Sequence, residues 1–371
     1  MMVKNEEESI KLSLNSFKNY IDTVVVFDTG STDNTVDIIK KTCTENKQTL
    51  HLKQGQFKTF PESRNEALEF ADKFPFKYIL MMDAGDEFKT SMTKNRFIEM
   101  LKTIPDNIDI GIIKQQWLEN KNSSLSDHYD CRLVKNHKNI RYDLDYPVHE
   151  QVCNADKLFS SNFGDSFYLY QDRIKYGESS EKRYHRDIEM LSKATPNKRN
   201  LYFLAQSYMS VNDFKNGFKY NVLSYECKDL NMDDKFTLVR IAFCAIQIKL
   251  IDIALKYIYI ILKLDEPPID AYIYLFDINI KNNSCDKVIK YVKTVYNMEK
   301  PSLQSSIKLV NHHFYDYLRF NLISIVCLFA NQELEIGKKA CEKALKYNKP
   351  DDIHNYKVYQ SLNLSFTLLE G

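Results

Sequence analysis

The sequence predicts an α/β domain with a mostly parallel sheet and helices on both faces, followed by an all-α solenoid. Up to about residue 115, short apolar runs of strand length alternate with helical patterns, as is typical of βαβ units. From about residue 185 onward only helical patterns recur, and they recur in pairs. With 371 residues, 44% of them hydrophobic, the chain can build more than one core.

Hydrophobic spacing places the elements of the first half. Residues 23–27 (TVVVF) and 77–82 (KYILMM) are continuous apolar runs, as expected for strands covered on both faces. Apolar residues recur at helical spacing over 10–21, and residues 62–74 are helix formers. Residues 110–117 (IGIIKQQW) predict a further strand near the end of this alternating region.

Four helical pairs make up the second half. They lie at 199–225, 235–262, 270–296 and 317–345. Aligning their second helices brings four positions into register, namely Gly217, Ala254, Val288 and Gly337. The first two steps are 37 and 34 residues, close to the tetratricopeptide period of about 34. We therefore expect stacked hairpins of this type, with a concave face available for binding.

A polar stretch with one glycine, residues 170–186, separates the two patterns. We therefore expect an α/β domain over 1–169, a linker or lid over 170–197 and a repeat domain over 198–371.

Composition limits the partners and the compartment. Fifty-one basic and 50 acidic residues leave a net charge of +1, which argues against a nucleic-acid partner. The most apolar later stretch, residues 250–264, is interrupted by Asp252 and Lys256, so we expect no membrane span. Eight dispersed cysteines without a CxxC motif, and no apolar signal sequence, predict a soluble cytoplasmic protein with reduced thiols.

Acidic residues follow two of the predicted strands. Asp28 ends the run TVVVFD and Asp83 ends YILMMD, so both should face the crevice beyond the carboxyl ends of the strands. Asp86 lies so close to Asp83 that their repulsion suggests a hard divalent cation between them. Gly30 and Gly85 follow the same strands and predict positive φ angles or close approach by a ligand. A capped βα turn without a ligand remains the alternative for residues 29–35.

These stretches resemble GT-A-fold glycosyltransferases of family 2, in the subgroup that carries tetratricopeptide-like repeats. The matching stretches, in the family's order, are MMVKNEEE, VVVFDTGSTDNT, FPESRNEAL, YILMMDAGDEF and CRLVKNHKNIRYDLDYPVHEQV. The resemblance implies a metal-dependent, inverting enzyme that transfers a sugar from a UDP-sugar. Its acceptor would be a protein, a peptide or a glycan held near the repeats.

The resemblance also implies roles for individual residues. Asp28 would bind the uracil, in a pocket that Asn5 and Glu6 help to line. The nucleotide-binding positions that it implies are Val3, Asn5, Glu6, Asp28, Gly30, Ser31, Arg64, Asn65, Asp83 and Ala84. The implied ligands of Mn²⁺ or Mg²⁺ are Asp86, Asp83 and His149. One imidazole among oxygen ligands would favour Mn²⁺.

An inverting transfer needs a general base for the acceptor hydroxyl. The candidates in the matched region are Glu150, Asp130 and Asp127, and we favour Glu150. Glu150 follows His149, so a supporting role beside the metal is the equal alternative for it.

Two other functions stay open. Only two residues precede Val3, and Gly85 stands where many relatives have an aspartate. Both features are compatible with an inactive, repeat-type binding scaffold that keeps a transferase-like domain. A nucleotidyltransferase would use similar carboxylates. The sugar, the acceptor, the linkage and the oligomeric state, including a homodimer, are not determined by the sequence.

Overall fold

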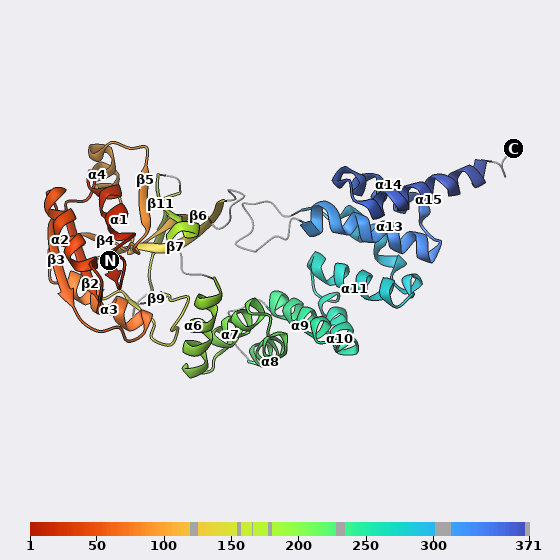
Figure 1. Cartoon of the computed structure of the whole chain (residues 1–371), viewed down its shortest axis with the longest axis horizontal. Helices are drawn as coiled ribbons and strands as arrows, with labels where there is room; N and C mark the ends of the chain where they lie inside the picture. The colour runs from red at the N-terminus through yellow and green to blue at the C-terminus, as the bar shows by residue number, and fades with distance from the viewer. Residues whose placement is uncertain are drawn as a thin grey trace. The chain divides into compact units, whose positions relative to one another are not determined.

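The chain folds into two compact units, Met1–Thr195 and Pro196–Gly371 (Figure 1). The computed structural model describes residues 1–118, 125–153, 157–164, 166–176, 180–227, 234–300 and 313–367. The first unit combines strands and helices, and the second is entirely helical over the residues described. The predicted order of an α/β domain followed by helices is therefore confirmed.

The first unit begins with a three-stranded parallel sheet in the order β1-β2-β3. Its strands are β1 (Met2–Val3), β2 (Thr23–Asp28) and β3 (Thr49–Gln54). The helices that follow them are α1 (Ile10–Phe17), α2 (Thr35–Glu45) and α3 (Phe60–Ala71). Helix α3 packs against β2, and α2 packs against β3. The predicted strand at 23–27 and the predicted helices are confirmed, although α1 ends before Ile21.

A second sheet is mixed rather than parallel. It runs in the order β4-β7-β6-β11-β5, with β10 also paired to β6. Its strands are β4 (Tyr78–Leu80), β5 (Asp86–Thr90), β6 (Ile110–Leu118), β7 (Leu125–Lys135), β10 (Ser160–Asn162) and β11 (Phe167–Asp172). β7 is antiparallel to β4 and β6, whereas β6 and β11 are parallel. The parallel arrangement expected from the βαβ pattern thus holds for the first sheet only.

One core connects the two sheets. Val24 and Val26 of β2 are buried in the same apolar cluster as Phe167 of β11 and Ile113 of β6. Helix α4 (Lys94–Lys102) adds Phe97, and α1 adds Leu14 to this cluster. The short pair β8 (Arg141–Tyr142) and β9 (Val152–Cys153) completes the first unit near α3.

The segment expected as a linker, 170–197, contains regular structure instead. It includes the end of β11, helix α5 (Arg173–Tyr176) and helix α6 (Ser180–Lys193). Leu191 is buried, and the Arg186 guanidinium lies 5.0 Å from the centre of the Phe60 ring. Because these contacts are made within the first unit, its boundary lies at residues 195–196 rather than at 169.

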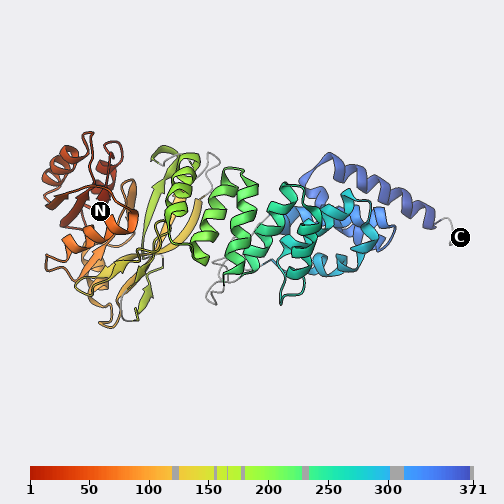
Figure 2. The ribbon, with the colours of Figure 1, turned by 90° about the horizontal axis from the view of Figure 1, so that it is seen from below.

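The second unit is a series of helical hairpins (Figure 2). The packed pairs are α7 (Lys198–Ser210) with α8 (Phe214–Glu226), α9 (Lys235–Gln247) with α10 (Ile251–Ile261), and α13 (Arg319–Ala330) with α14 (Leu334–Ala344). The remaining helices are α11 (Ile269–Lys281), α12 (Val292–Asn297) and α15 (Pro350–Thr367). The partner of α11 is broken, since 3₁₀ turns at Cys285–Lys287 and Ile289–Tyr291 precede α12. Among the described residues, no helix is long and apolar enough to cross a bilayer.

The four aligned positions lie where neighbouring helices come close. Ala254 and Val288 have no exposed surface, and Gly217 and Gly337 are buried. A Cβ atom on Gly217 would stand only 2.7 Å from Met209 Cγ. These contacts explain the glycines at two of the four positions, while the tetratricopeptide type of the repeat stays a prediction.

We expect Gly337→Ala to destabilise the helical unit by about 1 to 3 kcal/mol. The added Cβ would clash with the Tyr359 hydroxyl and would lie 2.6 Å from Cys327 Cβ. Thermal unfolding followed by helical circular dichroism would measure the loss. Lys339→Ala, at an exposed position of the same helix, is the matched control, and equal melting of the two variants would contradict the expectation.

Candidate active site

Asp28 is fixed at the carboxyl end of the central strand of the first sheet. It is 1% exposed and is the last residue of β2. Its Oδ1 accepts hydrogen bonds from the Ser31 amide at 3.0 Å and the Ser31 hydroxyl at 2.6 Å. Its Oδ2 accepts one from Gln54 Nε2 at 3.2 Å. The turn back to Ser31 requires Gly30, whose φ of +100° confirms the predicted left-handed position.

The loop after β1 is hydrogen-bonded to the loop after β2. The Asn5 amide donates to Ser31 Oγ at 3.0 Å, and the Thr32 amide donates to Asn5 Oδ1 at 2.8 Å. The Glu6 amide donates to Thr35 Oγ1 at 2.6 Å. The structure therefore brings Asn5 and Glu6 beside Ser31 and Thr35 in the turn after Asp28, and their role at a uracil pocket stays a prediction.

The second acidic group follows β4, where a tight turn holds Asp83 next to Asp86. The Asp83 amide donates to Asp86 Oδ2 at 2.9 Å, and Gly85 between them has a φ of +90°. Ser13 Oγ of α1 accepts from the Gly85 amide at 2.9 Å. This turn ends β4 at Leu80, two residues earlier than predicted. Burial, and then the charge of Asp83, raises the pKa of Asp86 to about 7.

Two mostly buried arginines form ion pairs with Asp83. Arg64 Nη1 of α3 lies 3.0 Å from Asp83 Oδ1, and Arg132 Nη1 of β7 lies 2.9 Å from Asp83 Oδ2. Burial by itself would raise the pKa of Asp83. The charges of Arg64 and then Arg132 outweigh burial and hold this pKa well below its ordinary value.

The same arginines connect two of the three candidate bases to Asp83. Arg64 Nε lies 3.1 Å from Glu150 Oε1, and Arg132 Nε lies 3.5 Å from Asp130 Oδ2. Asp127 instead accepts from Gln116 Nε2 at 3.0 Å. Since Asp127 precedes Asp130 by three residues on β7, it lies about 10 Å further along the strand.

Arg132 was not predicted as a site residue. It lies in CRLVKNHKNIRYDLDYPVHEQV, one of the stretches that resemble the family. A single arginine in a β-rich run does not indicate which residue it pairs with. Its pairing with Asp83, 49 residues earlier, depends on the antiparallel pairing of β4 with β7.

Three predicted site residues have surroundings that the sequence did not indicate. The side-chain amide of Asn65 donates to the Tyr142 carbonyl at 2.9 Å and accepts from the Tyr142 backbone N–H at 2.7 Å. These two bonds connect α3 to β8. Ala84 packs against the apolar core. His149 has a φ of +52° in the loop before β9. Within the described part of the chain, no three His, Cys, Asp or Glu side chains gather as a metal site.

One carboxylate of the acidic pair is already occupied by arginines. Both oxygens of Asp83 face arginines, so this carboxylate is already neutralised. In the described part of the chain, Asp86 forms no ion pair with an arginine, and the three-ligand metal site stays a prediction.

Comparison with known proteins links this site to a family. Residues 1–155 match the family model described as glycosyl transferase family 2. Two curated relatives are 26% identical over 212 residues: the SPbeta prophage-derived glycosyltransferase SunS of Bacillus subtilis (strain 168) and glycosyltransferase SunS of Bacillus phage SPbeta. Each match covers 56% of this chain and 47% of the relative, so the chain spans about half the length of the curated relatives it matches.

Solved structures of S. aureus TarS are also similar. One has 17% identity and a TM-score of 0.35, covering 67% of this chain and 48% of that chain. TarS 1-349 in complex with UDP-GlcNAc has 14% identity and a TM-score of 0.34, covering 98% and 90%. The family model matches the part of the chain that carries the site. Residues 1–155 of this chain are therefore a glycosyltransferase family 2 domain, and a helical unit follows it.

Proposed function

We propose that the chain is a metal-dependent, inverting glycosyltransferase that transfers a sugar from a UDP-sugar to an acceptor. The observation that carries this proposal is the pair Asp83 and Asp86, held with Arg64 and Arg132 inside the family 2 domain. Cations placed beside carboxylates suit a diphosphate leaving group, whose negative charge grows as the glycosidic bond breaks.

Asp28 is the proposed uracil ligand. A carboxylate has about four lone-pair sites, and the bonds from Ser31 and Gln54 use only part of them. The remaining capacity allows Asp28 to accept the ring N–H of uracil. Asn5 and Glu6, which are fastened to the same turn, would form the edge of this pocket.

The acidic pair fits a divalent cation. Asp86 is 3% exposed, and its ionised form is opposed by burial and by Asp83. A hard cation relieves both effects and prefers carboxylate oxygens, so Asp86 would be the direct ligand and Asp83 its neighbour. Bound there, Mn²⁺ or Mg²⁺ would supply charge neutralisation for the departing diphosphate.

Glu150 is the proposed general base. Arg64 holds its Oε1, which leaves Oε2 as an oxygen that can accept the acceptor's hydroxyl proton. Asp130 is the second candidate, because Arg132 connects it to Asp83. For the acceptor, a protein, peptide or glycan, the stacked hairpins of the helical unit are the proposed binding surface.

Calorimetry with UDP tests the donor site. UDP should bind the parent protein with Mn²⁺ present, and Asp28→Asn should weaken this binding. The matched control is Asp37→Asn, whose carboxylate on α2 is 84% exposed and should not affect UDP. Binding that is absent both with and without Mn²⁺ would rule out the proposal.

A screen of UDP-sugars then tests turnover. Slow, metal-dependent donor hydrolysis supports a transferase. UDP binding without any turnover of donor would favour the scaffold function. Consumption of a nucleoside triphosphate with release of pyrophosphate would favour the nucleotidyltransferase.

We expect Mn²⁺ affinity to rise with pH and to level off above about pH 7. Below this pH, Asp86 is protonated, so a cation must displace the proton. Displacement of one proton predicts about a tenfold gain in affinity per pH unit. Titration with Mn²⁺ alone avoids the ionisation of UDP itself. Asp37→Asn should follow the parent curve, and a flat parent curve would contradict the role of Asp86.

A further inference from the structure

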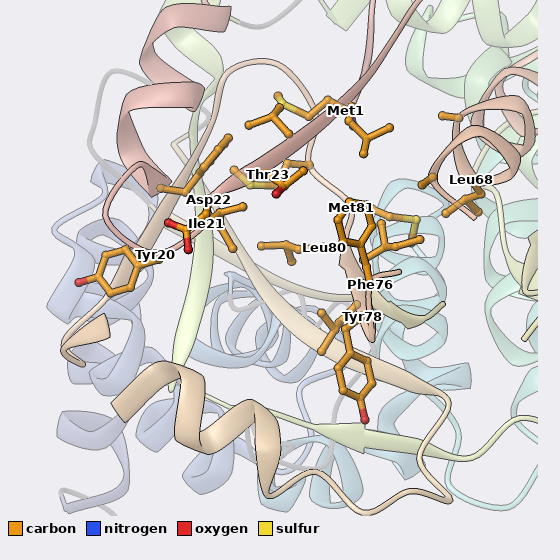
Figure 3. A pocket seen from close by; sticks show the side chains of 18 of the residues that line it. Met1, Tyr20, Ile21, Asp22, Thr23, Leu68, Phe76, Tyr78, Leu80 and Met81 are labelled. Atoms are coloured by element: carbon orange, nitrogen blue, oxygen red, sulfur yellow. The ribbon is translucent and has the colours of Figure 1, made fainter. Parts of the chain in front are cut away.

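The cavity in the first unit is mainly apolar, and its charged side chains are paired. It has a volume of about 370 Å³ and lies beside β2 and β4 (Figure 3). The charged side chains of its lining, Asp22 and Arg64, form ion pairs with Lys94 and Asp83. Among the described residues, a charge that lacks an opposite charge beside it lies instead in the helical unit.

Arg240 of α9 is a half-buried cation without a carboxylate partner in the described part of the chain. Its Nη2 donates to Gln206 Oε1 of α7 at 3.2 Å, and its guanidinium carbon lies 4.1 Å from the centre of the Tyr202 ring. Its Nη1 is buried and donates to none of the described residues. Burial lowers the pKa of Arg240.

This guanidinium differs from those of Arg64 and Arg132, which face carboxylates. Burying a cation without an opposite charge costs stability, and stacking on one tyrosine offsets only part of that cost. The contacts with Tyr202 and Gln206 also fix the direction of the guanidinium before a ligand binds. An arginine held in this way is suited to a carboxylate, which can accept two N–H bonds from its planar fork.

Aromatic side chains flank Arg240 on the same side of α9. Phe236 lies four residues before Arg240 and Phe243 three residues after it, so all three share one face of the helix. Each of them is half-buried, so this face keeps exposed surface. The Phe243 ring lies 6.1 Å from the ring of Tyr274, which continues the face onto α11. Apolar groups of a ligand would contact these rings beside the charge of Arg240.

The next first helix, α11, carries a negative charge on this face. The equivalents of Phe236 and Arg240 in α11, 34 residues later, are Asp270 and Tyr274. Asp270 is half-buried, and burial raises its pKa. A polyanion lying across both helices would meet this carboxylate, and burial lessens the screening of their repulsion. Charge complementarity therefore favours a ligand with a single acidic group.

We propose that Arg240, with Phe236 and Phe243, binds a peptide segment in which one acidic residue stands beside an apolar residue. The peptide carboxylate accepts from the Arg240 guanidinium, and the apolar side chain contacts the phenylalanine rings. Three residues of extended peptide span about 10 Å, close to the separation of Phe236 and Phe243 along α9. The segment belongs to the acceptor, and in that respect the inference rests on the proposed function.

An array of short peptides tests the site on the whole chain, without donor or metal. Each peptide has a central Glu or Gln between varied apolar or polar residues. At low salt, the best peptides should combine Glu with an apolar neighbour and should bind at least about tenfold more tightly than their Gln counterparts. This preference should disappear in Arg240→Met. It should remain in Lys215→Met, which removes an exposed cation of α8.

Thermal unfolding distinguishes recognition from a structural role. Methionine keeps much of the apolar stem of Arg240 and removes its charge. Without peptide, the Tm of the helical unit in Arg240→Met, followed by circular dichroism, should therefore equal or exceed that of the parent. A Tm at least about 5 °C lower would show that Arg240 supports the fold, and would overturn the proposal.

Two binding results would also overturn it. One is an array in which Glu peptides bind no better than their Gln counterparts. The other is inorganic polyphosphate that binds more tightly than the best Glu peptide and loses this binding in Arg240→Met, which would identify a polyanion site. UDP binding is measured separately: if UDP binds and Glu is not preferred, the inference fails and the proposed function stands. If Glu is preferred and UDP does not bind, the peptide site stands and only its acceptor role is lost.

Discussion

Asp86→Asn is expected to lower kcat/KM for donor hydrolysis by about a thousandfold while leaving the metal-free protein at least as stable as the parent. The loss of activity follows because a neutral amide is a poor ligand for a hard cation and cannot offset the charge on a diphosphate. Steady-state kinetics with Mn²⁺ would measure it.

The pKa of Asp86 predicts whether this variant is more or less stable than the parent. The folded-state pKa of Asp86, about 7, lies above its ordinary value of 3.8. The stability linked to its proton is therefore fully present below about pH 4 and is lost as pH rises to about 7. The amide carries no charge, so at pH 8 without metal the variant should gain up to about 4 kcal/mol over the parent.

Thermal unfolding in a chelator at pH 5 and pH 8 would measure this gain, which should be larger at the higher pH. Asp37→Asn is the control for removing a carboxylate from the first unit. A variant that is less stable at pH 8 and also inactive would show a structural role for Asp86, and would contradict this assignment.

Arg64→Met is expected to destabilise the first unit by about 2 to 4 kcal/mol, since it removes the cation that two partly buried carboxylates share. Asp83 Oδ1 and Glu150 Oε1 both lose their partner, at 3.0 and 3.1 Å. Methionine keeps much of the length and the apolar stem of the arginine side chain. The change in unfolding free energy therefore reports mainly on the lost charge rather than on lost volume. Denaturant unfolding followed by Trp117 fluorescence would measure the change.

A second substitution distinguishes loss of the Arg64–Glu150 ion pair from a general loss of stability. Adding Glu150→Gln to Arg64→Met should recover part of the stability, because it removes one unpaired charge. Lys58→Met is the matched control, since Lys58 forms an ion pair with Glu66 at 2.7 Å on the surface. That variant should unfold almost as the parent does. Losses of similar size for Lys58→Met and Arg64→Met would contradict the importance of the ion pairs that Arg64 forms.

Local patterns predicted the parts of the site that depend on neighbouring residues. The apolar run 23–27 predicted β2, and the aspartate after it lies at the strand end. Gly30 and Gly85 adopt the positive φ angles expected of glycine in these turns. The turn after β2 is closed locally, since the Ser31 hydroxyl donates to Asp28.

Partners that are distant in sequence could not be predicted in this way. Arg132 reaches Asp83 across 49 residues, and Glu150 reaches Arg64 across 86. The segment 170–197 looked like a linker because its polarity is high, yet it forms α5 and α6 and packs within the first unit. A polar amphipathic helix and a linker have similar composition, so only the contacts distinguish them.

The sequence by itself determined the order of an α/β unit and a helical unit, the strand-end aspartates and the glycine turns, because each depends on spacing within about ten residues. Only the tertiary structure decided the mixed second sheet and the two arginines on Asp83. These features follow from strand register and burial, which no local pattern encodes, since a pairing between distant strands depends on the packing of both with the rest of the core.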